Sequence, residues 1–174
     1  VLVVDRAPHG LVIDARGGGA DALVAAAPGI AVGVLVADCM PVLFADPIAG
    51  VVAAAHAGRR GLVAGVLQAT LSAMADLGAE ERQIVAVIGP AICGRCYEVP
   101  AEMRGEVDAE IPGTGCVTAR GTAGLDLPAG ALAILQARGV SATAVGVCTA
   151  EDDRYFSYRR DGRTGRLAGV VMLA

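Results

Sequence analysis

The sequence predicts a layered α/β or α+β domain, because strand-like runs outnumber helical ones and occur in series as well as in alternation with helices. Its 174 residues match the length of one ordinary domain. A hydrophobic fraction of 55% supplies enough apolar side chains for a sizeable core in a chain of this length. No G-x-G-x-x-G motif follows a predicted strand, so a dinucleotide-binding Rossmann fold is not expected.

The first third of the chain is predicted to consist of strands. Apolar and β-branched residues form short runs that Gly, Pro and Asp separate, which is typical of strands joined by tight turns. Turns are expected at residues 8–10, where His9 would be a surface residue, and at 17–19 and 46–49. The predicted strands cover residues 1–4, 11–14, 21–25, 30–36, 41–45 and 50–56.

The hydrophobic period changes to that of a helix after His56. One apolar stripe predicts an amphipathic helix over residues 60–77, and Gly78 suits its C-terminal end. The stripe consists of Leu62, Val63, Val66, Leu67, Leu71 and Met74.

The second half of the chain is predicted to alternate between strands and helices. Helices are expected at 100–110, which is rich in Glu, and at 128–138, which Gly139 closes. The strands and extended segments around them are predicted at 83–88, 117–119, 142–147, 155–158 and 167–173.

Composition and charge exclude several classes of protein. Charged residues make up only 18% of the chain and the net charge is −4, which argues against a disordered protein and against a general nucleic-acid-binding surface. The apolar runs stop at Asp38 and His56, well short of the roughly 20 residues that a membrane-spanning helix needs. The five cysteines lack the dense spacing of a secreted disulfide framework, so we expect a cytoplasmic protein with free or metal-bound thiols.

All 14 basic residues are Arg, because the sequence contains no Lys. Schiff-base chemistry and a phosphate-loop lysine are therefore excluded. Any bound phosphate must be held by Arg side chains or by backbone N–H groups.

A cysteine and a histidine lie at the ends of two predicted strands. Asp38-Cys39 follows the strand at 30–36, and His56 ends the strand at 50–56. Strand ends at one edge of a sheet can converge, so the thiolate and the imidazole could share a zinc or copper ion. Two alternatives stay open: a buried structural cysteine beside a hydrogen-bonded core histidine, and a Cys–His nucleophile pair with a lowered thiol pKa.

A C-x-x-C motif, Cys93-Gly94-Arg95-Cys96, forms a second candidate site on a loop after a predicted strand. In a cytoplasmic protein such a pair is a redox dithiol, half of a zinc site or two incidental cysteines. The sequence contains no second C-x-x-C, so a zinc ribbon is not expected.

Two arginine-rich segments could meet an anionic ligand. Arg59 and Arg60 open the long predicted helix, where backbone N–H groups favour anions. Residues 154–166 place five Arg among three aromatic residues, a composition suited to stacking on a base and binding phosphate. A solvated helix start and an exposed hairpin balanced by the acidic residues 151–153 are the alternatives.

Four sequence blocks occur in order along the chain. They are VADCMPVLFAD (36–46), AAAHAGRRGL (53–62), IGPAICGRCYEV (88–99) and FSYRRDGRTGR (156–166). Together they resemble the signature blocks of the laccase-domain, YfiH-like family, which is described both as multicopper polyphenol oxidases and as purine nucleoside phosphorylases. The resemblance implies a single domain over residues 1–174 with a layered α-β-β-α sandwich, similar to the catalytic domain of cytotoxic necrotizing factor.

The resemblance also implies a metal site of two His and one Cys. Cys39 matches the cysteine of the family's A-D-C block, and His56 matches the histidine of its H-A-G block. The family's other histidine lies upstream of a strand that resembles residues 1–5, so we expect it before residue 1, in an N-terminal segment that this chain lacks. Zinc is the expected metal and copper the alternative. Arg59 stands where the family usually has Trp.

The activity implied by the resemblance is phosphorolysis of purine nucleosides such as adenosine, inosine and methylthioadenosine, with adenosine deamination as a related activity. The expected partners are therefore a purine nucleoside and phosphate, with no nucleic acid and no membrane. Arg60 and Arg160 are expected to hold the phosphate, and Asp38 to orient a metal ligand or transfer a proton. Tyr97 is expected to stack on the base, with Arg59 beside the substrate.

Three alternative functions follow from the same family. They are a copper-dependent polyphenol oxidase, a hydrolase that edits peptidoglycan precursors and an inactive, binding-only domain. The chain contains two His, fewer than several copper centres would need, which disfavours the oxidase.

Overall fold

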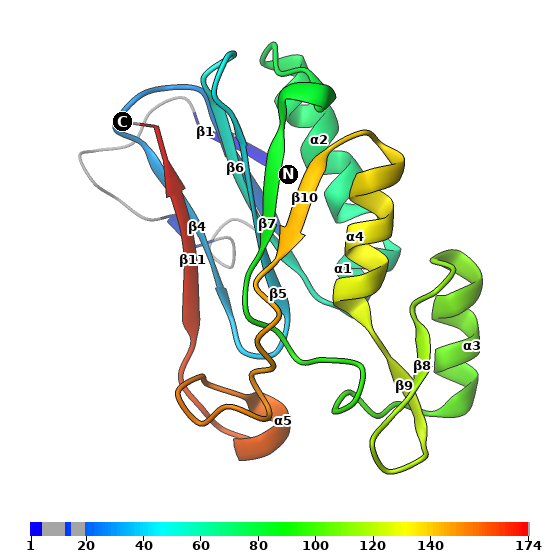
Figure 1. Cartoon of the computed structure of the whole chain (residues 1–174). Coiled ribbons are helices and arrows are strands. Elements are labelled where there is room, and N and C mark those ends of the chain that lie inside the picture. The colour runs from blue at the N-terminus through cyan, green and yellow to red at the C-terminus, as the bar shows by residue number, and fades with distance from the viewer. Residues whose placement is uncertain (5–12, 15–19, 174) are drawn as a thin grey trace.

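The computed structural model describes residues 1–4, 13–14 and 20–173 (Figure 1). The turns expected at 8–10, with His9, and at 17–19 lie outside these residues. The described strands are β1 (Leu2–Val4), β2 (Ile13–Asp14), β3 (Ala22–Ala25), β4 (Ala31–Val36), β5 (Met40–Asp46), β6 (Val51–Ala57), β7 (Val85–Ile88), β8 (Gly115–Val117), β9 (Ala123–Leu125), β10 (Ser141–Ala144) and β11 (Leu167–Met172).

Two packed β-sheets form the centre of the fold. The larger sheet has the strand order β1-β3-β6-β5-β7-β10, and the smaller has the order β11-β4-β2, while β8 and β9 form a separate ribbon. β5 and β6 pair antiparallel, with Met40 opposite Ala57 and Phe44 opposite Ala53. Because β3 and β6 are covered on both faces, their sequences are continuous apolar runs rather than alternating patterns.

Helices lie on one face of the larger sheet and beyond its end. Those described are α1 (Arg59–Val63), α2 (Val66–Asp76), α3 (Ala101–Glu110), which packs on the β8–β9 ribbon, α4 (Leu127–Ala137) and α5 (Tyr158–Asp161), with a 3₁₀ turn at Glu81–Gln83. α2 and α4 pack on the face opposite the smaller sheet, and α5 lies at the end of the sheet where β5 begins (Figure 1). Phe44, Leu67 and Leu71 are completely buried in the core between α2, α4 and the larger sheet.

This architecture confirms the mixed α/β class. One helical layer and two sheets of the expected sandwich are present, and no helix in the described part of the chain covers the outer face of the smaller sheet (Figure 1). None of the described helices is long and apolar enough to cross a membrane.

Two local predictions were wrong and one strand was missed. The helix expected at 60–77 is two helices, because Gly65 adopts a left-handed conformation with φ of 81° and begins α2 afresh. Residues 155–158 are not a strand, since the Ser157 side chain caps the short helix α5. β9 was not predicted because its three residues, Ala-Gly-Leu, carry no strand pattern of their own.

The turn expected at 46–49 joins β5 to β6 and is fixed by a buried carboxylate. Asp46 accepts hydrogen bonds from the backbone N–H groups of Ile48 (2.9 Å), Ala49 (2.9 Å) and Glu80 (3.0 Å). Burial acts to raise the pKa of Asp46, but these three donors outweigh it and hold the pKa below its usual value. The carboxylate therefore connects the central hairpin to the segment that follows α2.

We predict that Asp46→Asn lowers stability at neutral pH and weakens the response of stability to acid. A group with a lowered folded-state pKa stabilises the fold above its unfolded pKa, and this contribution disappears as the pH falls through the folded value. Because the amide leaves a buried donor unpaired, we expect a loss of about 1–3 kcal/mol at pH 7 that shrinks below about pH 4. Urea unfolding from pH 2 to 8 measures this, with Asp76→Asn on the exposed face of α2 as the control. A pH-independent difference would contradict the assignment.

Candidate functional site

Cys39 and His56 emerge together at the end of the larger sheet where β5 begins. In the β5–β6 register Pro41 lies opposite His56, so a side chain two residues before Pro41 points to the same face as the histidine. A Cβ added at Gly58 would lie 2.8 Å from Cys39 Sγ and 3.7 Å from His56 Nε2. The two side chains that the sequence singled out therefore face one small space, which a glycine keeps open.

Asp21 flanks the histidine on its other side. The backbone N–H of His56 donates to Asp21 O at 2.8 Å, and Asp21 Oδ1 lies 3.7 Å from His56 Nδ1. Nδ1 thus faces a carboxylate while Nε2 borders the space beside Gly58, an arrangement that can orient an imidazole ligand. Burial, and after it the charge of Asp38, raises the pKa of the Cys39 thiol, while Arg166 acts against them.

A cavity of about 470 Å³ opens beside this pair, and a second of about 400 Å³ shares its border. Cys39, His56, Arg59 and Tyr97 line both. The larger cavity is completed by Leu35, Val36, Ala37, Asp38, Ile92, Leu127, Tyr158, Arg159 and Arg166, and the smaller by Asp21, Gly58, Arg60 and Gly61.

Tyr97 and Arg159 form one wall of the larger cavity. The guanidinium carbon of Arg159 lies 5.2 Å from the centre of the Tyr97 ring, within cation–π range. Arg159 also donates to the carbonyl oxygen of Glu98 at 2.9 Å, which holds the stacked pair in place. With Arg59 and Arg166, this wall gives the cavity three cationic side chains and an aromatic face.

Asp38 ties this end of the fold together. It is the non-glycine residue with positive φ (76°) in the described part of the chain, in the three-residue connection between β4 and β5. One carboxylate oxygen accepts from Thr149 Oγ1 at 2.7 Å and the other from the backbone N–H of Arg159 at 2.6 Å. Its own carbonyl accepts from Ile92 N at 2.9 Å. Both carboxylate oxygens are thus engaged with the protein, which makes Asp38 a positioning residue of the cavity.

Arg160 lies apart from the larger cavity and is engaged in the chain's own structure. Its guanidinium donates to the carbonyl oxygens of Thr149, Asp152 and Tyr155 and pairs with the Asp161 carboxylate. It borders instead a third cavity of about 350 Å³. The structure therefore brings Arg59 and Tyr97 to the Cys39–His56 pair, places Arg60 on the smaller cavity and gives Arg160 a structural set of contacts.

A second group of side chains that could hold a metal ion lies beyond the same end of the sheet. One ligand atom each from Cys93, Cys96, Cys148 and Glu151 lies within 4.8 Å of the others, close enough to hold one metal ion. Among the described residues, this is the one group of three or more Cys, His, Asp or Glu side chains that lie close enough to share an ion. No third side chain of these types completes such a group with Cys39 and His56 in that part of the chain. Burial acts to raise the pKa of Cys148, but backbone donors, first that of Cys93, hold it below its usual value.

Sequence reasoning missed Arg159, Arg166 and Tyr158 as cavity residues, and Cys148 as a partner of the C-x-x-C motif. The first three lie in the arginine-rich segment that the sequence marked as suited to a base and a phosphate, so the signal was present without the individual assignment. Cys148 follows the strand predicted at 142–147 and is far from Cys96 in sequence, so only the pairing of β7 with β10 and of Ala91 with Cys148 reveals it.

These features define a mixed α/β domain whose main cavity combines a cysteine, a histidine, arginines and an aromatic wall. The chain belongs to the multi-copper polyphenol oxidoreductase laccase family, whose model matches residues 1–174.

Curated relatives of the family are named purine nucleoside phosphorylases. The Streptomyces coelicolor protein is 58% identical over 154 residues, covering 88% of this chain and 64% of that protein. The Streptomyces griseus protein is 55% identical over 174 residues, covering 99% of this chain and 70% of that protein. The chain thus spans about two thirds of the length of these relatives.

Solved structures share the fold. A Neisseria meningitidis protein of the DUF152 family superposes with a TM-score of 0.80 at 38% identity, covering 95% of this chain and 71% of that one. YlmD from Geobacillus stearothermophilus gives a TM-score of 0.80 at 30% identity, covering 88% and 60%.

We predict that Asp38→Asn loosens the arginine-rich segment. Asn tolerates positive φ, so the substitution removes the charge without adding backbone strain. Its oxygen can still accept from Arg159 N while its amide donates to Thr149 Oγ1, so both contacts lose the charge of the carboxylate, at a cost of about 1–2 kcal/mol. Limited proteolysis with trypsin, which cleaves after Arg, should cut within 154–166 several times faster. Asp153→Asn, directly before this segment, is the control, and equal protection of the two variants would contradict a role of the Asp38 carboxylate in holding the segment.

Proposed function

We propose that this chain is a metal-dependent purine nucleoside phosphorylase acting on adenosine, inosine and methylthioadenosine, with adenosine deaminase activity at the same site. The observation that carries the proposal is the larger cavity, where three arginines and the Tyr97 ring surround the Cys39–His56 pair. Its volume of about 470 Å³ falls within the usual range for small-molecule sites. The names of the relatives at up to 58% identity support the same activity.

Phosphorolysis places two demands on a protein without lysine. A phosphate oxygen attacks C1′ of the ribose, the bond from C1′ to the purine nitrogen breaks, and the base leaves with the bonding electrons and takes up a proton. The site must hold a dianionic phosphate and stabilise the departing base. Arg59, Arg159 and Arg166 are placed to bind phosphate, and Tyr97 offers a flat face for the purine. Arg60, on the adjoining cavity, is a further candidate phosphate ligand.

Cys39 and His56 would hold the metal, with zinc as the proposed ion and copper as the alternative. Their donor atoms face the gap kept open by Gly58, and thiolate and imidazole are ligands that zinc prefers. A bound zinc would supply a Lewis acid for polarising the purine or acidifying a water. The chain's own residues support the site: Asp21 flanks His56 Nδ1, and Asp38 positions the wall that carries Arg159. The contacts of Arg160 fit a positioning role better than direct phosphate binding.

A cytoplasmic location is part of the proposal, because the five cysteines lack the dense spacing of a secreted disulfide framework.

We predict phosphate-dependent release of free purine and sugar 1-phosphate by the full chain. The measurement is chromatography of products from adenosine, inosine and methylthioadenosine with and without phosphate. Cys39→Ala should lose at least a hundredfold in rate. Gly58→Ala should also be impaired, because its methyl group would lie 2.8 Å from Cys39 Sγ, whereas Gly105→Ala, where a Cβ meets nothing within 4 Å, should remain normal. Normal rates in Cys39→Ala would exclude a metal mechanism, and base release independent of phosphate would indicate a hydrolase.

We also predict that the cavity arginines set phosphate affinity. Arg159→Gln and Arg166→Gln should each raise the KM for phosphate about tenfold or more, because a charge-assisted hydrogen bond contributes roughly 1.5–3 kcal/mol. Arg163→Gln is the matched control, since Arg163 belongs to the same segment but does not line the cavity. An unchanged phosphate KM in both cavity variants would exclude this phosphate site.

A further inference from the structure

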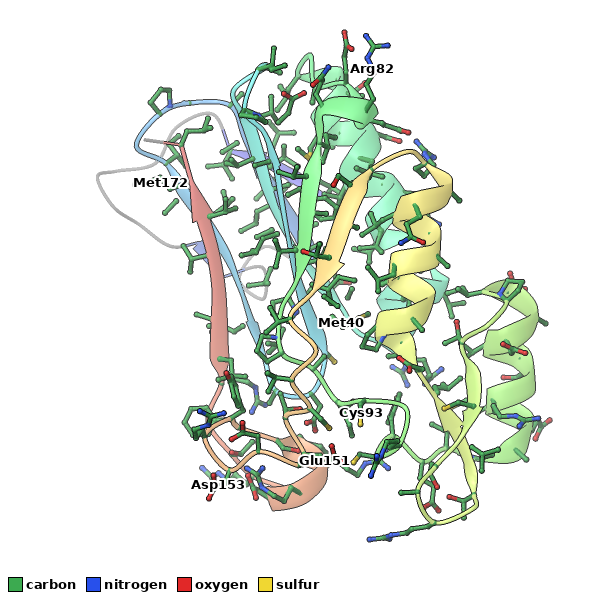
Figure 2. All side chains as sticks on the ribbon, in the orientation of Figure 1. Met40, Arg82, Cys93, Glu151, Asp153 and Met172 are labelled. Atoms are coloured by element: carbon green, nitrogen blue, oxygen red, sulfur yellow. The ribbon has the colours of Figure 1, made fainter. Side chains whose placement is uncertain are left out.

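We propose that Cys93, Cys96, Cys148 and Glu151 form a structural zinc site, separate from the Cys39–His56 pair, that fixes the wall of the cavity. The four ligand atoms lie within 4.8 Å of one another. Figure 2 shows Cys93 and Glu151 below the end of the larger sheet, on two different segments of the chain. The inference stands independently of the proposed function.

The ligand set and its spacing fit a tetrahedral zinc ion. Thiolates and carboxylates are both zinc ligands, and sulfur-rich sets of four favour zinc among the common divalent metals. With zinc–sulfur bonds of about 2.3 Å, tetrahedral ligands sit about 3.8 Å apart. The observed cluster requires only a small contraction to reach that geometry, and four protein ligands leave no open position for a substrate. The site is therefore structural rather than catalytic.

The backbone already holds the four ligands together. The N–H groups of Cys96 and Tyr97 both donate to Cys93 O at 3.0 Å, so a tight turn brings the first two thiols to one side. Ala91 pairs with Cys148 in a parallel bridge, which joins the segment after β7 to the segment after β10. Cys93 N donates to Cys148 Sγ at 3.3 Å. Hydrogen bonds from backbone N–H groups to a ligand sulfur are the kind of outer contact that stabilises a bound thiolate.

Arginines near the cluster offset its charge. Three thiolates and a carboxylate carry more negative charge than one zinc ion neutralises. Arg95 Nε lies 3.7 Å from Glu151 Oε1, and Arg95, Arg159 and Arg160 border the third cavity together with Cys96. Arg95 therefore offsets part of the negative charge that remains after zinc binds.

A zinc ion here would act on the neighbouring residues of the cavity. Tyr97 follows Cys96 directly, and Thr149, which donates to Asp38, follows Cys148. The carbonyl oxygen that anchors Arg159 belongs to Glu98. An ion that joins the segment after β7 to the segment after β10 would therefore fix the positions of Tyr97, Arg159 and Asp38 relative to one another.

The test is cobalt binding to the full chain in a Cys39→Ser background, which removes the thiolate of the first pair. Reduced, metal-free protein is titrated with Co²⁺, which reports tetrahedral thiolate coordination by its visible and near-ultraviolet absorption. We expect one equivalent to bind with the spectrum of several thiolate ligands and to be displaced by Zn²⁺. Adding Cys96→Ser should weaken binding more than tenfold and reduce the thiolate bands. Cys116→Ser, the matched control outside the cluster, should bind as the background does.

Zn²⁺ affinity and circular dichroism of a Glu151→Gln variant distinguish loss of a metal ligand from loss of the fold. Glu151→Gln changes an exposed side chain, and it should weaken Zn²⁺ binding several-fold with the thiolate bands retained, while circular dichroism stays unchanged. Absence of Co²⁺ binding in the Cys39→Ser protein would overturn the proposal, as would a Cys93–Cys148 or Cys93–Cys96 disulfide in protein purified with zinc present. Because none of these measurements uses a nucleoside, failure of the zinc site is distinguishable from failure of the phosphorylase.

Discussion

The arrangement of the site depends on the two hydrogen bonds that the Asp38 carboxylate accepts. The connection between β4 and β5 is three residues long, and its middle residue adopts positive φ, which turns the Asp38 side chain toward the loops beyond the sheet. There it accepts from Thr149 Oγ1 and Arg159 N, while its carbonyl accepts from Ile92 N. Three segments that are distant in sequence thereby meet one strand end. The contacts of Arg159 with Glu98 and of Arg160 with Thr149 hold the same arginine-rich segment from other sides.

The central hairpin supplies the other half of the geometry. β5 and β6 pair along their whole length, and small residues such as Ala53 and Ala55 let α2 approach β6 closely. The register then decides that Cys39 and His56 share a face, since a shift by one residue would turn one of them to the opposite side. The same packed core that gives the domain its stability therefore also sets the spacing of the two candidate metal ligands.

Much of the fold and part of the site could be predicted from the sequence. The class, the central strands and the helix at 128–138 followed from local patterns. That Cys39 and His56 could converge followed from their places at the ends of predicted strands, whereas their expected role as metal ligands came from the resemblance to the family. The break at Gly65 was missed because an apolar stripe continues through it, and only the backbone conformation shows that the helix restarts. The Cys148 partnership was missed because it depends on the parallel pairing of β7 with β10, which no local pattern encodes.

The absence of lysine makes the distribution of arginines informative. An arginine fork that already donates to several protein acceptors has few N–H groups left for a ligand, whereas one held by a single contact keeps most of its fork available. Arg160 is of the first kind, with three carbonyls and a carboxylate around it, and Arg159 is of the second, stacked on Tyr97 with one donor on Glu98. Adjacent residues of the same type thus divide two tasks. The contacts of Arg160 fix the fold of the segment, so Arg159 could bind the proposed phosphate without reorganising.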